Sequence, residues 1–202
     1  MKVAPLFLLS ALVLTGCGGS DGGSSSSDTG STSSNMSGGS TTNPVPDSGG
    51  NTGTTTPVAP PQSNEFSDLM LYAVNQARST QQNCGGDIMP AVPALTWDYS
   101  LESAAYAHSS DMANADFMDH TGSDGSSPGD RISATGYEFS AWAENVAAGQ
   151  QSIDEVMASW LSSPGHCKNI MSSSVTQLGA AAVENADTRY GIYWTQVFAR
   201  PL

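Results

Sequence analysis

The chain has few basic residues. Its 202 residues include 6 Lys and Arg against 19 Asp and Glu, which gives a formal net charge of −13. Five of the bases and sixteen of the acids lie from Glu65 onward. A surface this acidic is repelled by phosphate backbones and by anionic lipid headgroups. The composition therefore argues against nucleic acid as a partner, and against an anionic lipid surface as the main one.

Long hydrophobic runs are also lacking, with one exception at the N-terminus. Residues 3–14 are apolar and follow Lys2, but they are too few to span a bilayer as a helix, so we interpret residues 1–16 as an export signal. The sequence LTGC at residues 14–17 matches a bacterial lipobox, which predicts cleavage before Cys17 and acylation of its thiol. The alternative is an ordinary secretory signal followed by a chance cysteine.

Acylation of Cys17 would determine where the protein works. Several acyl chains hold a protein durably on a membrane. Gly18, rather than an aspartate, follows the cysteine and favours the outer membrane of a Gram-negative cell. We therefore expect an extracytoplasmic lipoprotein of the cell outer membrane, with the lipid membrane as its partner through Cys17. Whether the protein faces the periplasm or the outside stays open.

Cysteine is scarce too, with 3 in the chain. Once Cys17 is lipidated, Cys84 and Cys167 remain as an even pair in an exported protein, where disulfides persist. We expect these two cysteines to be bonded to each other. A pair of metal thiolates is the alternative, but neither cysteine stands in a CxxC or a similar ligand cluster.

Residues 17–64 separate the signal from the rest of the chain. After Cys17 they consist almost wholly of Gly, Ser, Thr, Asn, Asp and Pro. Such a segment cannot bury enough apolar surface to offset its ordering entropy, so we expect a disordered linker. Residues 65–202 have the length of one ordinary domain with its own core.

Within residues 65–202 the apolar spacing predicts helices and strands. Asn64 is placed to cap the first helix, and Pro164 with Gly165 to end the third. This order of helices and mostly antiparallel strands predicts an α+β sandwich. The first expected helix begins at residue 66, and the other two span residues 99–117 and 153–161. The expected strands span residues 145–148, 177–184 and 190–199. Residues 122–129 are expected to form a loop.

Four short blocks contain two of the three histidines and a glutamate. They are HTG at 120–122, ENVA at 144–147, Trp160 with SPGH at 163–166, and YWTQVF at 193–198. In order and spacing they resemble the bacterial branch of the CAP superfamily, the SCP-like domains, which includes cysteine-rich secretory proteins, insect venom antigens and plant pathogenesis-related proteins. The resemblance covers nearly all of residues 65–202. It implies a CAP-type α-β-α sandwich with a mostly antiparallel sheet between helices.

The resemblance also implies a surface cavity built from two histidines and two acids. His120 and Glu144 match the family's motifs. The chain departs from the pattern at the other two positions, where Ser163 replaces an acid and Tyr193 replaces a histidine. His166 of the SPGH block, which bacterial relatives carry, is the natural substitute. We therefore expect these five residues in one cavity.

Two imidazoles and one carboxylate suit a divalent metal such as Zn²⁺, with an open position for water. If the protein has a cofactor, we expect it to be this metal, held by His120, Glu144 and His166. The alternative is that both histidines hold the loops together by hydrogen bonds, while Glu144 accepts from backbone N–H groups.

Other polar residues near the blocks have plainer interpretations. His108 lies on the apolar face of the second helix, so a place in the core or the cavity wall is favoured over a ligand role. Three acids near the end of that helix lack the spacing of a calcium loop. Activation of one of three nearby serines by a histidine is an alternative, but no oxyanion-hole motif accompanies these serines. The acids are Asp111, Asp116 and Asp119, and the serines are Ser126, Ser127 and Ser163.

The resemblance and the lack of a catalytic constellation together favour a binding protein over an enzyme. We expect a monomeric CAP domain that binds a small apolar ligand, a lipid or an envelope component in the His/Glu cavity. One alternative is a metal-dependent or serine-type hydrolase of peptide or cell-wall substrates. The other is an adhesion or interaction module, for which the linker matters more than the cavity.

Overall fold

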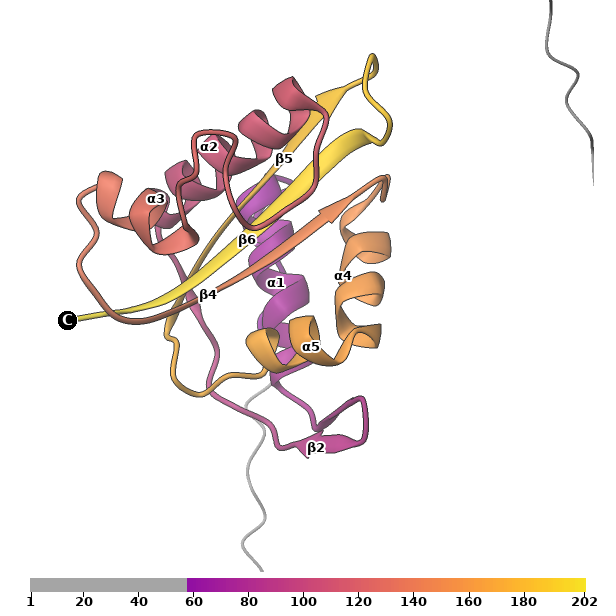
Figure 1. The fold of residues 1–202 in the computed structure, drawn as a ribbon. Coiled ribbons are helices and arrows are strands. Elements are labelled where there is room, and N and C mark those ends of the chain that lie inside the picture. The colour runs from indigo at the N-terminus through magenta and orange to yellow at the C-terminus, as the bar shows by residue number, and fades with distance from the viewer. Residues whose placement is uncertain (1–57) are drawn as a thin grey trace, which may run out of the picture. The chain divides into compact units, whose positions relative to one another are not determined.

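A four-stranded sheet forms the centre of the computed structural model, which describes residues 58–202 (Figure 1). All of these residues belong to one unit of the chain, Gly50–Leu202. The strand order is β3-β5-β6-β4, and only the β3 and β5 pair is parallel. The strands are β3 (Thr96–Trp97), β4 (Phe139–Ala148), β5 (Gln177–Asn185) and β6 (Gly191–Pro201).

The predicted export signal, Cys17 and the linker up to residue 57 lie outside the described residues. Residues 58–62, near the end of the predicted linker of residues 17–64, line a small pocket with Leu71 and Tyr72 of the first helix. Across residues 58–202, every helix is too short or too polar to cross a membrane.

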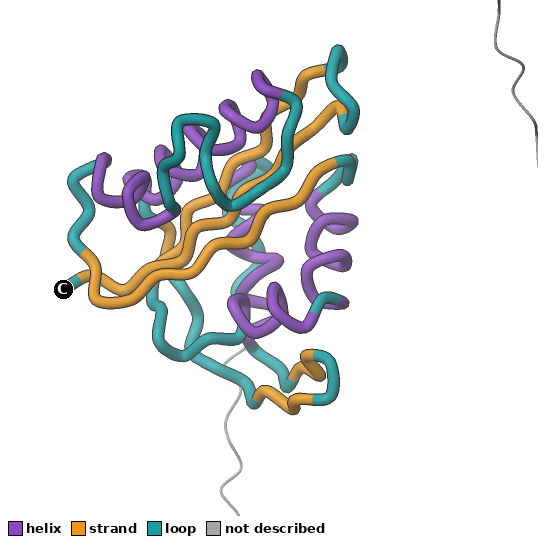
Figure 2. Tube along the Cα trace, in the orientation of Figure 1, coloured by secondary structure: helices purple, strands orange, loops and turns teal. Residues whose placement is uncertain are grey.

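Helices cover both faces of the sheet (Figure 2). The residues of β6 alternate between two apolar clusters. Trp194 and Phe198 pack with one set of helices, and Val197 and Ala199 pack with the other. This confirms the predicted α+β fold, an α-β-α sandwich with a mostly antiparallel sheet. The first layer contains α1 (Phe66–Arg78), α4 (Ile153–Ser162) and α5 (Pro164–Ile170), and the second contains α2 (Tyr99–Ala115) and α3 (Pro128–Ala134).

α2 lies unusually close to the sheet at its first turn. A Cβ atom added to Gly179 of β5 would come within 2.1 Å of the backbone nitrogen of Glu102. Only glycine allows this approach. Asp98 caps the same turn by accepting hydrogen bonds from the backbone N–H groups of Ser100 and Leu101.

The structure corrects three predicted boundaries. α1 begins after Glu65, which makes no side-chain cap, so Asn64 is not the N-cap. The predicted loop 122–129 ends in α3, because Ser127 and Asp130 form a capping box around Pro128. Pro164 does not simply stop a helix. It also occupies the first turn of α5, where its missing N–H costs nothing.

Two further boundaries differ. The predicted strand 145–148 is the end of the ten-residue strand β4. The predicted helix 99–117 stops at Ala115, because Asp116 takes a left-handed conformation with φ 50°.

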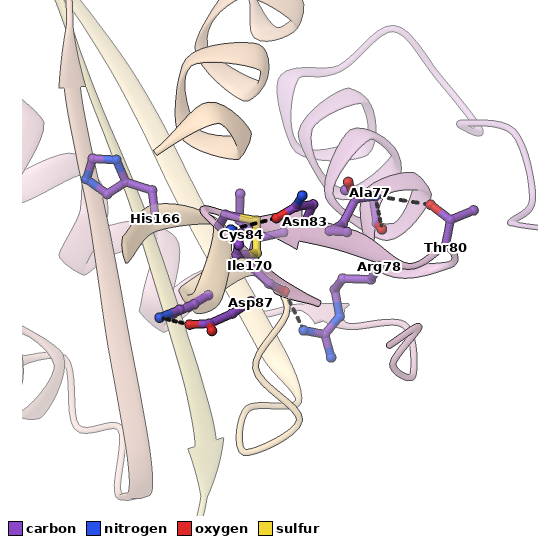
Figure 3. Close-up of a disulfide and its surroundings, with 12 residues drawn as sticks. Ala77, Arg78, Thr80, Asn83, Cys84, Asp87, His166 and Ile170 are labelled. Atoms are coloured by element: carbon purple, nitrogen blue, oxygen red, sulfur yellow. Dashed lines mark hydrogen bonds and ion pairs between the residues drawn. A yellow bond between two sulfur atoms is a disulfide. The ribbon is translucent and has the colours of Figure 1, made fainter. Parts of the chain in front are cut away.

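A short hairpin is attached to α5 by a disulfide. The hairpin consists of β1 (Gln82–Cys84) and β2 (Asp87–Met89). Cys84 and Cys167 are bonded, with their Cα atoms 5.4 Å apart, which confirms the predicted disulfide (Figure 3). Nζ of Lys168, the next residue of α5, lies 2.5 Å from the carboxylate of Asp87. The hairpin is therefore held covalently and by charge to the helix that contains His166.

Candidate functional site

Glu144 is the centre of a buried polar group. Its side chain is 1% exposed and lies on β4, on the face covered by α2 and α3. Oε1 accepts a hydrogen bond from Nδ1 of His120 at 2.9 Å, and Oε2 accepts one from Nη2 of Arg131 at 2.8 Å. Nε2 of His108 lies 4.0 Å from Oε1. Both carboxylate oxygens are therefore already engaged by cationic or N–H groups.

The loop that carries His120 is fixed from two sides. Arg131 also donates to the backbone oxygens of His120 and Ser126, each at 2.9 Å. His108, which is fully buried, donates from Nε2 to the backbone oxygen of Asp119 at 2.8 Å. The loop backbone therefore has the buried supports that a positioned side chain requires.

The ring of His120 is oriented by Glu144 but remains half-exposed. Because Nδ1 donates to the carboxylate, Nε2 is the nitrogen free to accept a proton, a metal or a ligand group. The hydrogen bond to Glu144 is the main reason that the pKa of His120 is raised above its ordinary value, against the opposing effect of burial.

His166 reaches the same region from the other helical layer. The neighbouring residues Glu144 and Asn145 point to opposite faces of β4, and Asn145 donates to the backbone oxygen of His166 at 3.3 Å. Asn169 of α5 donates both to the backbone oxygen of Glu144 and to Oδ1 of Asn145. α5 is thereby hydrogen-bonded along the outer edge of β4.

The pKa of His166 is affected by His120. Burial lowers the pKa of His166, and the charge of His120 lowers it further. His166 is therefore neutral at a pH where His120 begins to gain a proton. Figure 3 shows its ring on α5 pointing away from the disulfide that fixes the adjacent Cys167.

Two predicted cavity residues are not hydrogen-bonded to this group in the part of the chain that the structure describes. Tyr193 is fully buried, and its hydroxyl donates to Asp116 at 2.7 Å. Ser163 joins α4 to α5, and its backbone oxygen accepts from the N–H of Cys167. That Tyr193 and Ser163 belong to one cavity with His120, Glu144 and His166 stays a prediction.

In residues 58–202 no three His, Cys, Asp or Glu side chains are arranged so that they could hold a metal ion. Arg131 also disfavours a cation at Glu144, because its guanidinium contacts one carboxylate oxygen and repels cations. Zinc binding by His120, Glu144 and His166 stays a prediction.

The serines considered as nucleophiles have structural partners instead. The hydroxyl of Ser127 donates to Asp130 in the capping box at 2.6 Å. Oγ of Ser126 accepts from Arg131 at 3.3 Å. The hydrogen bonds of the described residues include none between a serine hydroxyl and His120 or His166.

Arg131 was missed by the sequence reasoning. It is the only Lys or Arg between residues 79 and 167 of a strongly acidic chain, and that isolation was the available signal. A lone base among so many acids is expected to pair with a buried carboxylate.

A large apolar groove lies between α1 and α4 and was also not predicted. Its volume is about 780 Å³. The lining includes no Lys, Arg or His and a single acid, Asp154, and it shares no residue with the Glu144 group. Residues of α1 at spacings of three and four form one wall, residues of α4 form the other, and Pro61 closes one side. The lining is Pro61, Leu69, Tyr72, Ala73, Gln76, Ala77, Ser152, Ile153, Asp154, Met157, Ala158 and Leu161.

Known proteins resemble this chain in sequence. Residues 71–198 match the model of the cysteine-rich secretory protein family, CAP. The uncharacterized protein YkwD of Bacillus subtilis is 30% identical over 158 residues, which are 78% of this chain and 56% of that protein. The uncharacterized membrane protein YlbC of Bacillus subtilis is 28% identical over 106 residues, 52% of this chain and 29% of that protein. The chain thus spans little more than half of the first relative and under a third of the second.

Solved structures resemble it in fold. An extracellular protein from Bacillus anthracis that contains an SCP domain superposes with a TM-score of 0.51 and 26% identity, over 66% of this chain and 38% of that chain. An outer surface protein of Borrelia burgdorferi also gives a TM-score of 0.51, with 22% identity over 55% of this chain and 80% of that chain. The second likeness concerns the fold alone.

Proposed function

The chain belongs to the cysteine-rich secretory protein (CAP) family, and from this premise we propose that it binds an uncharged apolar ligand, such as a single acyl chain of a neutral lipid, between α1 and α4. The observation that carries the proposal is the groove of about 780 Å³ with its apolar lining. Pockets for small molecules have volumes of roughly 300–1,000 Å³, are lined mainly by apolar groups and have a few polar groups at defined places.

The shape of the groove suits an elongated ligand. The wall that α1 forms runs from Leu69 to Ala77, and these two residues are about 12 Å apart along the helix axis. Tyr72, Ile153 and Leu161 contribute apolar surface that stays partly exposed in the folded protein. Each methylene placed against such surface contributes about 0.8 kcal/mol.

The charges around the groove favour a neutral headgroup. Gln76, Ser152 and Asp154 are polar residues of the lining, and the domain around them is strongly acidic. A fatty acid carboxylate would meet no compensating base in this lining. A monoacylglycerol, a fatty alcohol or a sterol avoids that repulsion.

The location we propose supplies such ligands. The lipobox at Cys17 would anchor the protein to the outer membrane, which contains lipids that could serve as ligands. The extracellular protein from Bacillus anthracis that this chain resembles supports a place outside the cytoplasm.

The test is a calorimetric titration of the full chain, purified in detergent below its micelle concentration, with 1-palmitoylglycerol. Ala73→Trp and Ala158→Trp fill the groove from its two walls. Displacing three to four methylenes would cost about 3 kcal/mol, or roughly a hundredfold in affinity. Ala107→Trp, at an exposed alanine of α2 on the opposite face of the sheet, is the matched control and should bind as the wild type does. Equal affinity in all four proteins would reject the proposal, and palmitate should bind more weakly than its glycerol ester.

A hydrolase is the second candidate, and one observation favours it. The Glu144 carboxylate orients His120 through Nδ1 and leaves Nε2 at the surface, the arrangement that a general base requires. If this is the function, His120→Gln abolishes hydrolysis of peptide or cell-wall substrates while the protein stays folded. Retention of turnover by this variant would exclude His120 as the base.

A further inference from the structure

Strand β4 lies at one edge of the sheet, and β6 is its only neighbour there among the described residues (Figure 1). In an antiparallel pair, every second residue directs its backbone N–H and C=O to the partner strand, and the residues between direct theirs outward. The N–H of Gly149, just after β4, donates to the backbone oxygen of Ile192 on β6 at 2.9 Å. Counted back by twos from Gly149, the odd-numbered residues face β6, so Trp142 and Glu144 face outward.

Side chains of two helices contact one end of this outer side. Nδ2 of Asn169 on α5 donates to the backbone oxygen of Glu144 at 3.1 Å, and Nε1 of Trp160 on α4 donates to that of Val146 at 3.2 Å. Both bonds agree with the outward direction of the even-numbered residues. These contacts end before Trp142. The hydrogen bonds of residues 58–202 include none to the backbone N–H or C=O of Trp142, and none to the N–H of Glu144.

Three backbone groups are therefore unpaired in a row, the N–H and C=O of Trp142 and the N–H of Glu144. Such a row on an edge strand is a template for a further strand. Glu144 is 4% exposed, and a backbone N–H of a buried residue normally has a partner. An extended peptide presents C=O and N–H groups at the repeat of the strand itself, so it can pair with all three. An acyl chain has no group that can pair with them.

The side chain of Trp142 adds an apolar surface to this edge. The residue is 42% exposed. A Cβ atom added to Gly129 would lie 3.3 Å from Nε1 of its indole, so the ring lies against the first turn of α3. Because the side chains of a strand alternate between two faces, every second side chain of an added strand comes to the face of the ring. In this mode of recognition the backbone bonds give affinity and such side-chain contacts give specificity.

Charge determines which peptide suits the edge. The domain has sixteen acids against five bases, and two of the exposed acids, Asp130 in α3 and Glu138 just before β4, are close in sequence to the residues of the edge. Arg131 is a nearby base, but its guanidinium is bound to Glu144. A second copy of the chain brings a further net charge of −13, and residues 18–64 contain no Lys or Arg. Repulsion disfavours both, whereas a peptide rich in Lys or Arg is attracted.

We propose that the outer edge of β4 at Trp142 binds an extended basic segment of another protein, which adds one strand to the sheet. One residue of that segment both donates to and accepts from the backbone of Trp142, and a neighbouring C=O accepts from the N–H of Glu144. The site shares no residue with the groove between α1 and α4, so it does not depend on the lipid proposal.

The test is a calorimetric titration of the full chain with the peptide Ac-Lys-Val-Lys-Val-Lys-Val-Lys-NH2. Trp142→Ala keeps the backbone N–H but removes the ring, and should weaken binding about tenfold. Trp142→Pro removes the ring and the N–H together, in a place where an edge strand tolerates proline. It should bind about fivefold more weakly than the alanine variant, which is the expected contribution of one backbone hydrogen bond.

Two control peptides separate strand pairing from attraction between charges. The same peptide with an N-methyl group on every residue keeps its charges but cannot donate, so it should bind at least about tenfold more weakly. The peptide with Glu in place of every Lys should not bind. Because the attraction is between exposed charges, added salt should weaken the binding of the lysine peptide.

Amide hydrogen exchange, followed by NMR, identifies the strand edge that is used. When the lysine peptide binds, the N–H groups of Trp142 and Glu144 should become protected from exchange. Those of Ala143 and Asn145 should change little, because they already face β6. Protection of every second residue is what an added strand produces and what a peptide bound only by its charges does not.

Four results would overturn the proposal. They are absence of binding by the folded wild type, equal affinity of the N-methylated peptide, binding without protection at Trp142, and a concentration-dependent dimer that Trp142→Pro abolishes. The last would assign the edge to a second copy of the chain. Far-UV circular dichroism shows whether each variant is folded, and if the proline variant is not, the N-methylated peptide decides the matter on the wild type.

Discussion

The disulfide between Cys84 and Cys167 gives a prediction whose size follows from the chain itself. The bonded residues are 83 apart in sequence. In the chain-entropy model, closing a loop of this length removes enough freedom from the unfolded chain to stabilise the fold by about 4.5 kcal/mol at 25 °C. Both residues are 1% exposed, so alanine at each position removes only a small buried sulfur.

The perturbation is therefore Cys84→Ala with Cys167→Ala, compared with the wild type by urea unfolding. The fluorescence of the buried Trp160 and Trp194 reports the transition. The variant should lose about 4 kcal/mol, and its melting temperature should fall by roughly 10 to 18 °C. The Lys168 and Asp87 pair is largely exposed and contributes too little to replace the bond.

Reductant supplies the control. Wild-type protein unfolded in dithiothreitol should match the variant, and the variant itself should be indifferent to dithiothreitol. The free energy of unfolding should fall more steeply with urea concentration in the variant, because its unfolded chain is more expanded. A loss of less than about 1 kcal/mol in the free energy of unfolding would contradict this prediction. It would mean that contacts between the hairpin and α5 already restrict the unfolded chain when the disulfide is absent.

Three further predictions concern the Glu144 group and the sheet. Arg131→Ala should destabilise the protein by about 3–5 kcal/mol in the same urea assay, because it leaves a buried carboxylate without its guanidinium; a loss under about 1 kcal/mol would contradict this. In an NMR titration the pKa of His120 should lie above its unfolded value of about 6.5 and that of His166 below it. The contact of protonated His120 with Glu144 then stabilises the fold fully below about pH 6.5, and this contribution is lost as the pH rises through the pKa of His120 in the folded protein. A pKa of His166 above that of His120 would contradict this account. Gly179→Ala should prevent folding or destabilise the protein by several kcal/mol, because its Cβ would meet the backbone of α2 at 2.1 Å. The melting temperature measures the effect, and a variant as stable as the wild type would show that α2 can move away.

The sequence patterns predicted most of the elements because those patterns are local, and the resemblance to the CAP superfamily implied the layers. The alternation of residues 193–199 directs side chains to two faces, and the structure places them there. Helix α3 was not predicted, although the capping box of Ser127 and Asp130 at its start is an equally local signal. Pro164 was ambiguous for a physical reason, because the same ring ends one helix and begins the next.

The candidate site was harder to predict because its contacts are long-range. His120 and Glu144 are joined across 24 residues, and family motifs pointed to both. Arg131 carries no motif, and only the folded chain shows that it reaches Glu144. The groove has no sequence signature, because its width depends on how far apart α1 and α4 pack, which no single segment determines.

The most direct test of the central claim is to locate a bound ligand. We would incubate the full chain with a monoacylglycerol whose acyl chain carries a diazirine, irradiate it, and map the labelled peptides by mass spectrometry. The account predicts labels in α1 and α4, within residues 66–78 and 153–162, and their loss in Ala158→Trp. Labels concentrated in residues 116–148, around His120 and Glu144, would contradict it and return the ligand to the His/Glu site.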